Sequence, residues 1–307
     1  MTRHHSLPFA RVLPALTLAG ALCLAAPDAG AQQPFPTPEE AASALAAAVK
    51  SGTRREMLRV LGSGGEDIIS SGDDIADKET RERFTAAYDA KHSIKPEGDK
   101  KAVMIVGNDD FPFPIPLMKT KSGWEFDTAA GRLEVLYRRI GRNEIDAIQT
   151  CLAFVDAQNE YAEKDRGQGV GVYAQRIVST TGKKDGLYWP GDDSPLGELA
   201  AQASAEGYKV GEGPIPYHGY YYRVLTQQGP NAPGGTLSYV VKGKMIGGFA
   251  LLAYPAEYGN SGVMTFLVNH NGIVYQKDLG GSTASLVKRM NWFDPDQTWK
   301  KVDTSSK

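Results

Sequence analysis

Cysteine is scarce in this chain. Its 307 residues include two cysteines, Cys23 and Cys151. Cys23 lies in a segment that we expect to be removed, so a single thiol remains and an intrachain disulfide is excluded. The fold must therefore be stabilised by the burial of apolar side chains, for which a chain of this length has enough material.

An excess of charge of either sign is also missing. The 34 Lys and Arg residues are balanced by 36 Asp and Glu residues, which gives a formal net charge of −2. This balance excludes a strongly basic nucleic-acid binder, so we predict no nucleic-acid partner. The composition, with 41% hydrophobic and 9% aromatic residues, is typical of a folded globular protein and excludes a disordered chain.

Apolar runs are too short to cross a membrane. The longest run beyond the N-terminal region, 245–254, has ten residues including two glycines, whereas a spanning helix needs about 20. The run 12–26 follows a basic leader and precedes the small residues 29–31. This pattern predicts a signal peptide over residues 1–31. We therefore expect an exported protein of the periplasm or cell envelope, or a secreted one, without a transmembrane span in the mature chain.

Two helix starts are evident early in the mature chain. Thr37 stands before Pro38, and the apolar run that follows ends at Gly52. A capping residue, proline at the first helical position and a terminal glycine together predict a helix. Thr53 repeats the capping pattern, and Gly62 ends the second predicted helix.

The pattern then changes from helices to strands. A third helix is predicted over 78–91, followed by a buried strand over 102–107. Proline occupies every second position of 111–116, which removes the N–H donors from one side of an extended chain and predicts an edge strand. A further strand is predicted over 124–127.

Helical spacing resumes at residue 133. Apolar residues at 133, 136, 137 and 140 predict one helix, Gly141 is expected to interrupt it, and Asn143 is expected to cap a second helix that runs to about Lys164. This interruption divides the mature chain into two predicted domains, an N-terminal α+β region over 34–141 and a second domain over 142–303.

The second domain is predicted to be a long helix packed on an antiparallel sheet. A loop-rich region over 167–219, with a short helix near 196–205, precedes a series of β patterns. Asn271-Gly272 predicts a tight hairpin between the last two predicted strands, 263–269 and 273–277. The fold class is therefore α+β, and the order of elements resembles that of type IV pilins and pseudopilins. The predicted strands are 220–226, 237–241, 246–253, 263–269 and 273–277.

Motifs for catalysis and metal binding are missing from the sequence. Its mature part has three histidines, none in an H-E-x-x-H pair, and it has no G-x-S-x-G elbow. Ser285 and Lys288 match S-x-x-K, but the accompanying K-T-G element is absent. We predict no catalytic residue, no metal site and no cofactor.

One aromatic cluster is the candidate binding surface for an unknown envelope ligand or protein. Tyrosine offers apolar area together with a hydroxyl group, which suits contacts with a sugar, a peptide or another protein. The other interpretation is that these rings fill a half-buried sheet surface. The candidate residues are Tyr188, Trp189, Tyr217, His218, Tyr220 and Tyr222.

Several strings together resemble a bacterial exported family known as domain of unknown function 2950. They include VGNDDFPFPIPL at 106–117, GKKDGLYWP at 182–190, PYHGYYYR at 216–223 and a long C-terminal stretch at 245–280. The resemblance covers nearly the whole mature chain and implies one exported unit. It implies no activity and no catalytic residues.

Three hypotheses for function remain open at this point. The first is a non-catalytic envelope or periplasmic protein that binds a ligand or partner through its C-terminal sheet and aromatic loop region. The second is an exported hydrolase of envelope polymers, and the third is a structural assembly subunit, with the oligomeric state open. The carboxylates considered for the hydrolase, with His218 as a possible partner, are Asp109, Asp110, Asp185, Asp192 and Asp193.

Overall fold

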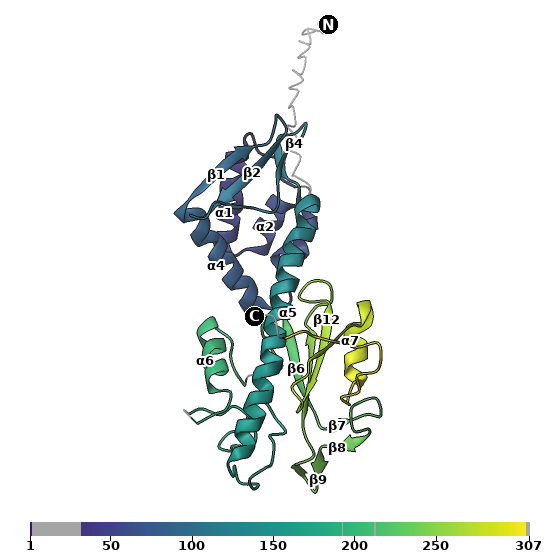
Figure 1. Ribbon diagram of the computed structural model, residues 1–307. Coiled ribbons are helices and arrows are strands. Elements are labelled where there is room, and N and C mark those ends of the chain that lie inside the picture. The colour runs from purple at the N-terminus through teal and green to yellow at the C-terminus, as the bar shows by residue number, and fades with distance from the viewer. Residues whose placement is uncertain (2–31, 192, 212, 305–307) are drawn as a thin grey trace.

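The molecule consists of two lobes joined by one long helix (Figure 1). The computed structural model describes Met1 and residues 32–191, 193–211 and 213–304. The predicted signal peptide at 1–31 lies, Met1 excepted, outside the described residues. Helices and antiparallel strands occur in both lobes, which confirms the α+β class.

The first helix of the N-terminal lobe confirms its predicted ends. The Oγ of Thr37 accepts a hydrogen bond from the N–H of Glu40 at 3.1 Å, and α1 (Pro38–Ser51) follows. The helix ends at Gly52, whose φ of 66° lies in the left-handed region that glycine adopts without a steric penalty.

The helix predicted from residue 78 begins at Asp74 instead. It forms α4 (Asp74–Ala90), and the side chain of Asp73 caps it by accepting the N–H of Ala76 at 3.1 Å. Asp73 therefore sets the start of the helix through a local hydrogen bond. The other elements of this region are α2 (Arg54–Leu61), α3 (Glu66–Ile69) and the 3₁₀ helix Ser63–Gly65.

The strands of the N-terminal lobe form one antiparallel sheet. Its order is β1-β2-β4-β5, and β3 (Phe111–Pro112) pairs with β2. The edge strand predicted over 111–116 is thus reduced to two residues, because its prolines cannot donate to a neighbouring strand. The remaining strands are β1 (His92–Pro96), β2 (Lys101–Val106), β4 (Leu117–Lys119) and β5 (Trp124–Phe126).

A single helix, α5 (Thr128–Glu163), runs through both lobes, so the predicted interruption at Gly141 is wrong. The helix has 36 residues. A Cβ at Gly141 would meet nothing within 4 Å, and an exposed glycine costs a helix only about 1 kcal/mol. Asn143 is buried inside the helix, where its Nδ2 donates to the carbonyl of Ser261 at 2.9 Å. The boundary between the predicted domains 34–141 and 142–303 therefore falls within α5, and that division stays a prediction.

Two glycines of α5 provide a matched test of this continuous helix. We expect Gly141→Ala to raise the free energy of unfolding by about 1 kcal/mol, because alanine favours an uninterrupted exposed helix. We expect Gly131→Ala to lower it by about 2 kcal/mol, because the new Cβ would lie 2.5 Å from the Cα of Ile115. Urea unfolding of both variants measures the two changes. A destabilising Gly141→Ala would contradict a helix that continues through this position.

The C-terminal lobe places a five-stranded antiparallel sheet against α5, as predicted. Its order is β14-β13-β12-β11-β6. Glu144 of α5 anchors the sheet, because its Oε1 accepts the N–H groups of Val263 and Met264, each at 2.9 Å. The strands are β6 (Tyr220–Leu225), β11 (Ala250–Pro255), β12 (Met264–Asn269), β13 (Tyr275–Asp278) and β14 (Lys300–Lys301).

The strand predicted over 237–241 lies outside this sheet. It forms two short pieces, of which the first pairs with β7 and the second with β10. Gly247 and Gly248 delay the start of β11, predicted at 246, because the chain turns at Gly248 with a φ of 128°. The short elements are β7 (Gln227–Gln228), β8 (Leu237–Ser238), β9 (Val240–Val241) and β10 (Lys244–Met245).

The predicted hairpin between β12 and β13 is present, but it is not a two-residue turn. Pairing of the two strands begins at Leu267 and Tyr275. The connection is wider because Asn269 still pairs with Ala250 of β11 and its carbonyl accepts the N–H of Gly272 at 2.8 Å. The helices of the lobe are α6 (Gly197–Glu206) and α7 (Thr283–Leu286), with 3₁₀ helices Gly280–Ser282 and Val287–Arg289.

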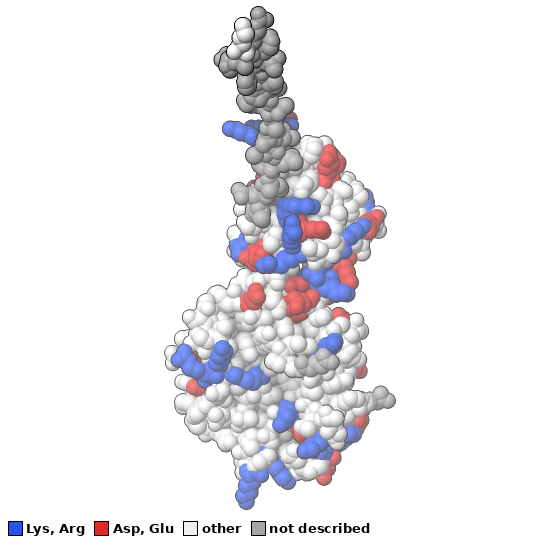
Figure 2. All heavy atoms as spheres, turned by 180° about the vertical axis from the view of Figure 1, so that it is seen from behind, with Lys and Arg blue, Asp and Glu red and all other residues white. Residues whose placement is uncertain are grey.

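Two further features concern the helices and the surface of the molecule. Within the part of the chain that the structure describes, no helix combines the length and apolar composition that a bilayer span requires. Viewed from behind, charged side chains of both signs gather at the waist between the lobes, whereas much of the middle of the C-terminal lobe carries none (Figure 2).

Candidate functional site

A cavity of about 290 Å³ lies in the C-terminal lobe between α5, α6, the 177–217 region and the sheet. Thr150 and Phe154 of α5 form one side, and Leu251 and Tyr254 of β11 lie on the sheet side. This volume is close to the lower end, about 300 Å³, of pockets that hold small ligands. The cavity lies between the aromatic region and the sheet.

Helix α6 and the segment before it form the wall opposite α5. The helix presents Leu199, Ala200 and Ala203 to the cavity. The Oγ of Ser194 donates to the carbonyl of Leu187 at 3.0 Å and thereby folds the preceding loop back on itself. Because backbone and side-chain hydrogen bonds hold this wall, the cavity is formed without a ligand.

The polar groups of the cavity are hydroxyls rather than charges. Among the lining residues that the structure describes, none is Asp, Glu, Lys, Arg or His. The buried Oη of Tyr222 has no hydrogen-bond partner among the described residues. Burial raises the pKa of Tyr222 well above its usual range and that of Tyr217 to about 12. Both hydroxyls therefore stay neutral at physiological pH.

The predicted aromatic cluster is divided between this cavity and other places. Tyr188, Tyr217 and Tyr222 line the cavity. Trp189 is 5% exposed, and its Nε1 donates to the Oδ1 of Asp193 at 2.9 Å. Tyr220 is fully buried, and its Oη donates to the carbonyl of Met264 at 2.9 Å. The structure thus brings three of the six candidates together and places Trp189 and Tyr220 in the hydrophobic core.

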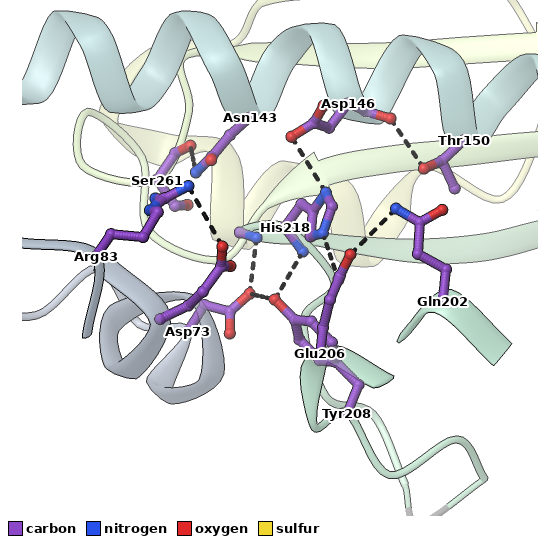
Figure 3. A network of polar contacts seen from close by, with 12 residues as sticks. Asp73, Arg83, Asn143, Asp146, Thr150, Gln202, Glu206, Tyr208, His218 and Ser261 are labelled. Carbon is purple, nitrogen blue, oxygen red and sulfur yellow. Dashed lines mark hydrogen bonds and ion pairs between the residues drawn. The ribbon is translucent and has the colours of Figure 1, made fainter. Parts of the chain in front are cut away.

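His218, the sixth candidate, belongs to a polar network beside the cavity (Figure 3). Its Nδ1 lies 3.1 Å from the Oδ2 of Asp146 on α5, and its Nε2 lies 2.8 Å from the Oε2 of Glu206 at the end of α6. The ring stacks on Tyr217, with centroids 4.1 Å apart. His218 therefore holds α5, α6 and the start of β6 together next to a residue of the cavity wall.

Asp73 connects this network to the N-terminal lobe. Its Oδ2 accepts hydrogen bonds from the Oη of Tyr208 and the N–H of Gly219, both at 2.9 Å. The side chain of Asp73 also caps α4, and the residue is 1% exposed. One buried carboxylate therefore links the first helix turn of α4 to the loop that enters β6 (Figure 3).

The environment of His218 favours its charged form. Burial by itself would lower its pKa, but the hydrogen bonds and negative charges of Asp146 and Glu206 outweigh burial and raise the pKa above its usual value. A general base needs a free ring nitrogen that can accept a proton, whereas both nitrogens here face carboxylates. This arrangement suits an ion-paired structural histidine.

The protonated His218 is expected to make stability depend on pH. The pKa of His218 is raised in the folded state. Its contribution to the free energy of unfolding is therefore complete below the pKa of about 6.5 that histidine has in the unfolded chain, and it is lost as the pH rises through the higher pKa of the folded state. We expect His218→Gln to abolish this fall in unfolding free energy above pH 6.5. Burial lowers the pKa of His270, so this residue changes the unfolding free energy with pH in the opposite direction. The quantity to measure by urea unfolding is therefore the difference in unfolding free energy between the wild type and His218→Gln at each pH. An unchanged pH dependence in the variant would contradict the assignment.

The carboxylates of the hydrolase hypothesis do not form one site. Asp110 pairs with Lys91 in the N-terminal lobe, at 2.6 Å. Asp193 pairs with Lys184 at 2.5 Å, and Asp185 accepts the N–H of Thr180 at 2.7 Å. Asp109 is exposed next to Asp110, and Asp192 lies outside the described residues. General acid and base catalysis requires two groups that converge on one bond, and the described carboxylates are distributed over both lobes.

Sequence reasoning missed the apolar walls of the cavity. Leu199, Ala200 and Leu251 lie on a helix and a strand, where an apolar residue has the same pattern whether it faces a core or a cavity. The spacing of Thr150 and Phe154, one helical turn apart on α5, is a signal that they share a face, but it does not show what that face meets. Among the described residues, no group of His, Cys, Asp or Glu is arranged to hold a metal ion.

Fold and site together define an α+β protein with a preformed apolar cavity between a long helix and an antiparallel sheet. The chain belongs to the family described as protein of unknown function (DUF2950), which it matches over residues 32–302. No curated protein and no solved structure matches the chain. The family confirms the resemblance found in the sequence, whereas the likeness to pilins stays a prediction.

Proposed function

We propose that this chain is an exported envelope or periplasmic protein that binds a small, uncharged, mainly apolar molecule without transforming it. The cavity between the aromatic region and the sheet is the observation that carries this proposal. Three aromatic residues that the sequence marks as candidates line it: Tyr188, Tyr217 and Tyr222. Aromatic walls with a few hydroxyls are typical of sites that grip the apolar body of a ligand and orient one polar group.

The lining supports an uncharged ligand. A charged group that enters an apolar site loses its hydration, and among the described lining residues no ionised side chain stands ready to compensate for that loss. The tyrosine side chains of the lining instead favour a ligand with a hydrogen-bond acceptor, because a hydroxyl group can donate to it. Because the pKa values of Tyr222 and Tyr217 are raised, their hydroxyl groups do not act as general acids or bases near neutral pH.

Export is supported by the sequence pattern of residues 1–31 alone. N-terminal sequencing of the protein recovered from fractionated cells tests it, and the expected first residue is Gln32. Recovery of the full-length chain in the cytoplasm would contradict it. The hydrolase and assembly hypotheses remain predictions.

Filling the cavity tests binding. Ala200 is buried on the cavity side of α6, whereas its neighbour Ala201 is exposed and lies outside the lining. We expect Ala200→Phe to weaken binding of the neutral fluorophore N-phenyl-1-naphthylamine by at least about tenfold, because the new ring displaces apolar contacts of the probe. Ala201→Phe is expected to bind like the wild type. Fluorescence titration measures both affinities.

The control for this experiment is the folded state of each variant. Circular dichroism spectra that match the wild type establish that Ala200→Phe has kept the fold. Equal affinity of the wild type and a folded Ala200→Phe would contradict the proposed site, and so would the absence of binding to the wild type.

A further inference from the structure

A second cavity, of about 520 Å³, lies in the N-terminal lobe. Its interior is apolar and is lined by side chains from α1, α4 and the segment after β3, among them Leu45, Phe84, Phe113 and Ile115. Phe84 and Phe113 are only partly buried, and their rings lie 5.4 Å apart. These rings therefore leave apolar surface open to an occupant.

Arginines line the same cavity in excess over carboxylates. Five arginines face it, against Asp77 and Asp109. Three of them have other partners: Arg83 pairs with Glu79 at 3.3 Å, Arg138 pairs with Glu134 at 2.6 Å, and Arg139 donates to the backbone carbonyls of Asp67 and Ile68. The five are Arg81, Arg83, Arg138, Arg139 and Arg142.

Arg142 is one of the cations of this lining that are available to a ligand. Within the residues that the structure describes, its guanidinium forms no hydrogen bond or ion pair. Burial lowers its pKa, and the positive charge of Arg83 lowers it further, while Asp146 and Glu79 act in the opposite direction. Arg83 pairs with Glu79 at 3.3 Å. An anion next to Arg142 and Arg83 would offset the repulsion between the two guanidinium groups.

The two arginines also mark where the apolar cavity meets a polar one. Arg83 and Arg142 line a smaller cavity of about 130 Å³ that reaches His218 and Glu206 of the network in Figure 3. The larger cavity thus combines an apolar lining with guanidinium groups that it shares with a smaller polar space. This polarity matches a molecule with an apolar chain and an anionic head.

We propose that the N-terminal cavity binds a long-chain fatty acid, with its alkyl chain among Leu45, Phe84 and Phe113 and its carboxylate at Arg142 and Arg83. A guanidinium group presents a planar fork of donors that matches a carboxylate, so the head gains directional, charge-assisted hydrogen bonds. The site is distinct from the cavity of the C-terminal lobe, whose described lining is uncharged. The inference therefore stands or fails independently of the proposed function.

Isothermal titration with a series of medium-chain carboxylates, which are more soluble than the long-chain acids, tests this site. From octanoate to dodecanoate, below their micellar concentrations, each added methylene is expected to tighten binding by about fourfold. Decanoate is expected to bind about tenfold or more tightly than 1-decanol, because the alcohol lacks the charge that pairs with Arg142. Equal affinities for decanoate and 1-decanol, or affinities that do not change with chain length, would overturn the proposal.

Two variants locate the site. Arg142→Gln is expected to weaken decanoate binding by about tenfold while leaving 1-decanol unaffected. Ala87 lines the cavity on α4 and its neighbour Ala86 is exposed outside the lining, so Ala87→Phe is expected to abolish binding and Ala86→Phe to preserve it. Loss of decanoate binding in Ala200→Phe, with full binding in Arg142→Gln, would assign the fatty acid to the C-terminal cavity and overturn the proposal.

Discussion

Replacing Asp73 with alanine is expected to lower the free energy of unfolding by about 4 kcal/mol. The carboxylate caps α4, and loss of such a cap costs about 1 kcal/mol. It also accepts from the Tyr208 hydroxyl and the Gly219 N–H, and each buried donor left without a partner costs about 1–3 kcal/mol. The two contributions come from different lobes, so the substitution weakens α4 and the entry to β6 together. Urea unfolding monitored by tryptophan fluorescence measures the change.

Asp74 provides the matched control for this substitution. It is the next residue, also acidic, and exposed at the first turn of α4. Asp74→Ala is expected to change the free energy of unfolding by less than about 0.5 kcal/mol. Tyr208→Phe removes one of the two donors and should fall between Asp74→Ala and Asp73→Ala. A loss below 1 kcal/mol in Asp73→Ala would show that the carboxylate does not link the lobes.

Tyr220→Ala is expected to cost about 4 kcal/mol, which is the range for emptying a core site of an aromatic ring. The side chain is fully buried, and its ring lies 5.7 Å from that of Phe266. Its hydroxyl donates to the carbonyl of Met264, so the substitution also leaves that acceptor unpaired. Thermal or urea unfolding measures the loss.

This result separates the two interpretations of the aromatic cluster. The binding interpretation requires that Tyr217, Tyr220 and Tyr222 can be replaced without loss of the fold, whereas the core interpretation requires that they stabilise it. The structure places Tyr220 in the core, while Tyr217 lines the cavity. Tyr217→Ala is therefore the comparison, and its effect should be on probe affinity more than on stability. A stable Tyr220→Ala variant with weakened binding would contradict the core assignment.

Local signals in the sequence predicted the ends of the elements best. The cap at Thr37 and the terminal glycine at Gly52 rest on hydrogen bonds within a few residues, so the sequence alone contains them. The start of α4 at Asp74 was missed although Asp73 is an ordinary capping residue, because the apolar spacing used for the prediction begins later in the helix.

Long-range packing explains the largest error in the fold. Gly141 is a weak helix residue and Asn143 a frequent cap, which together predict a break. The side chain of Asn143 bonds instead to Ser261, 118 residues away, and tertiary contacts on both lobes keep α5 continuous. Local propensity could not reveal that contact, because it depends on the position of the loop after β11.

The candidate site could be predicted only in part, because some of its contacts also depend on long-range packing. Aromatic residues in a loop-rich region stand out, so Tyr188, Tyr217 and Tyr222 were found. The carboxylates that flank His218 come from α5 and from the end of α6, and their proximity follows from how these helices pack. Spacing along the chain carries no information about such a contact between distant elements.

Methyl NMR of the protein titrated with N-phenyl-1-naphthylamine tests the binding cavity most directly. We expect the methyl signals of residues that line it to shift together in a saturable way, while the signals of Leu45 and Met57 in the N-terminal lobe stay in place. Shifts confined to the N-terminal lobe, or spread over the surface without saturation, would contradict a ligand site between α5, α6 and the sheet. The reporting residues are Ile177, Leu196, Leu199, Ile215 and Leu251.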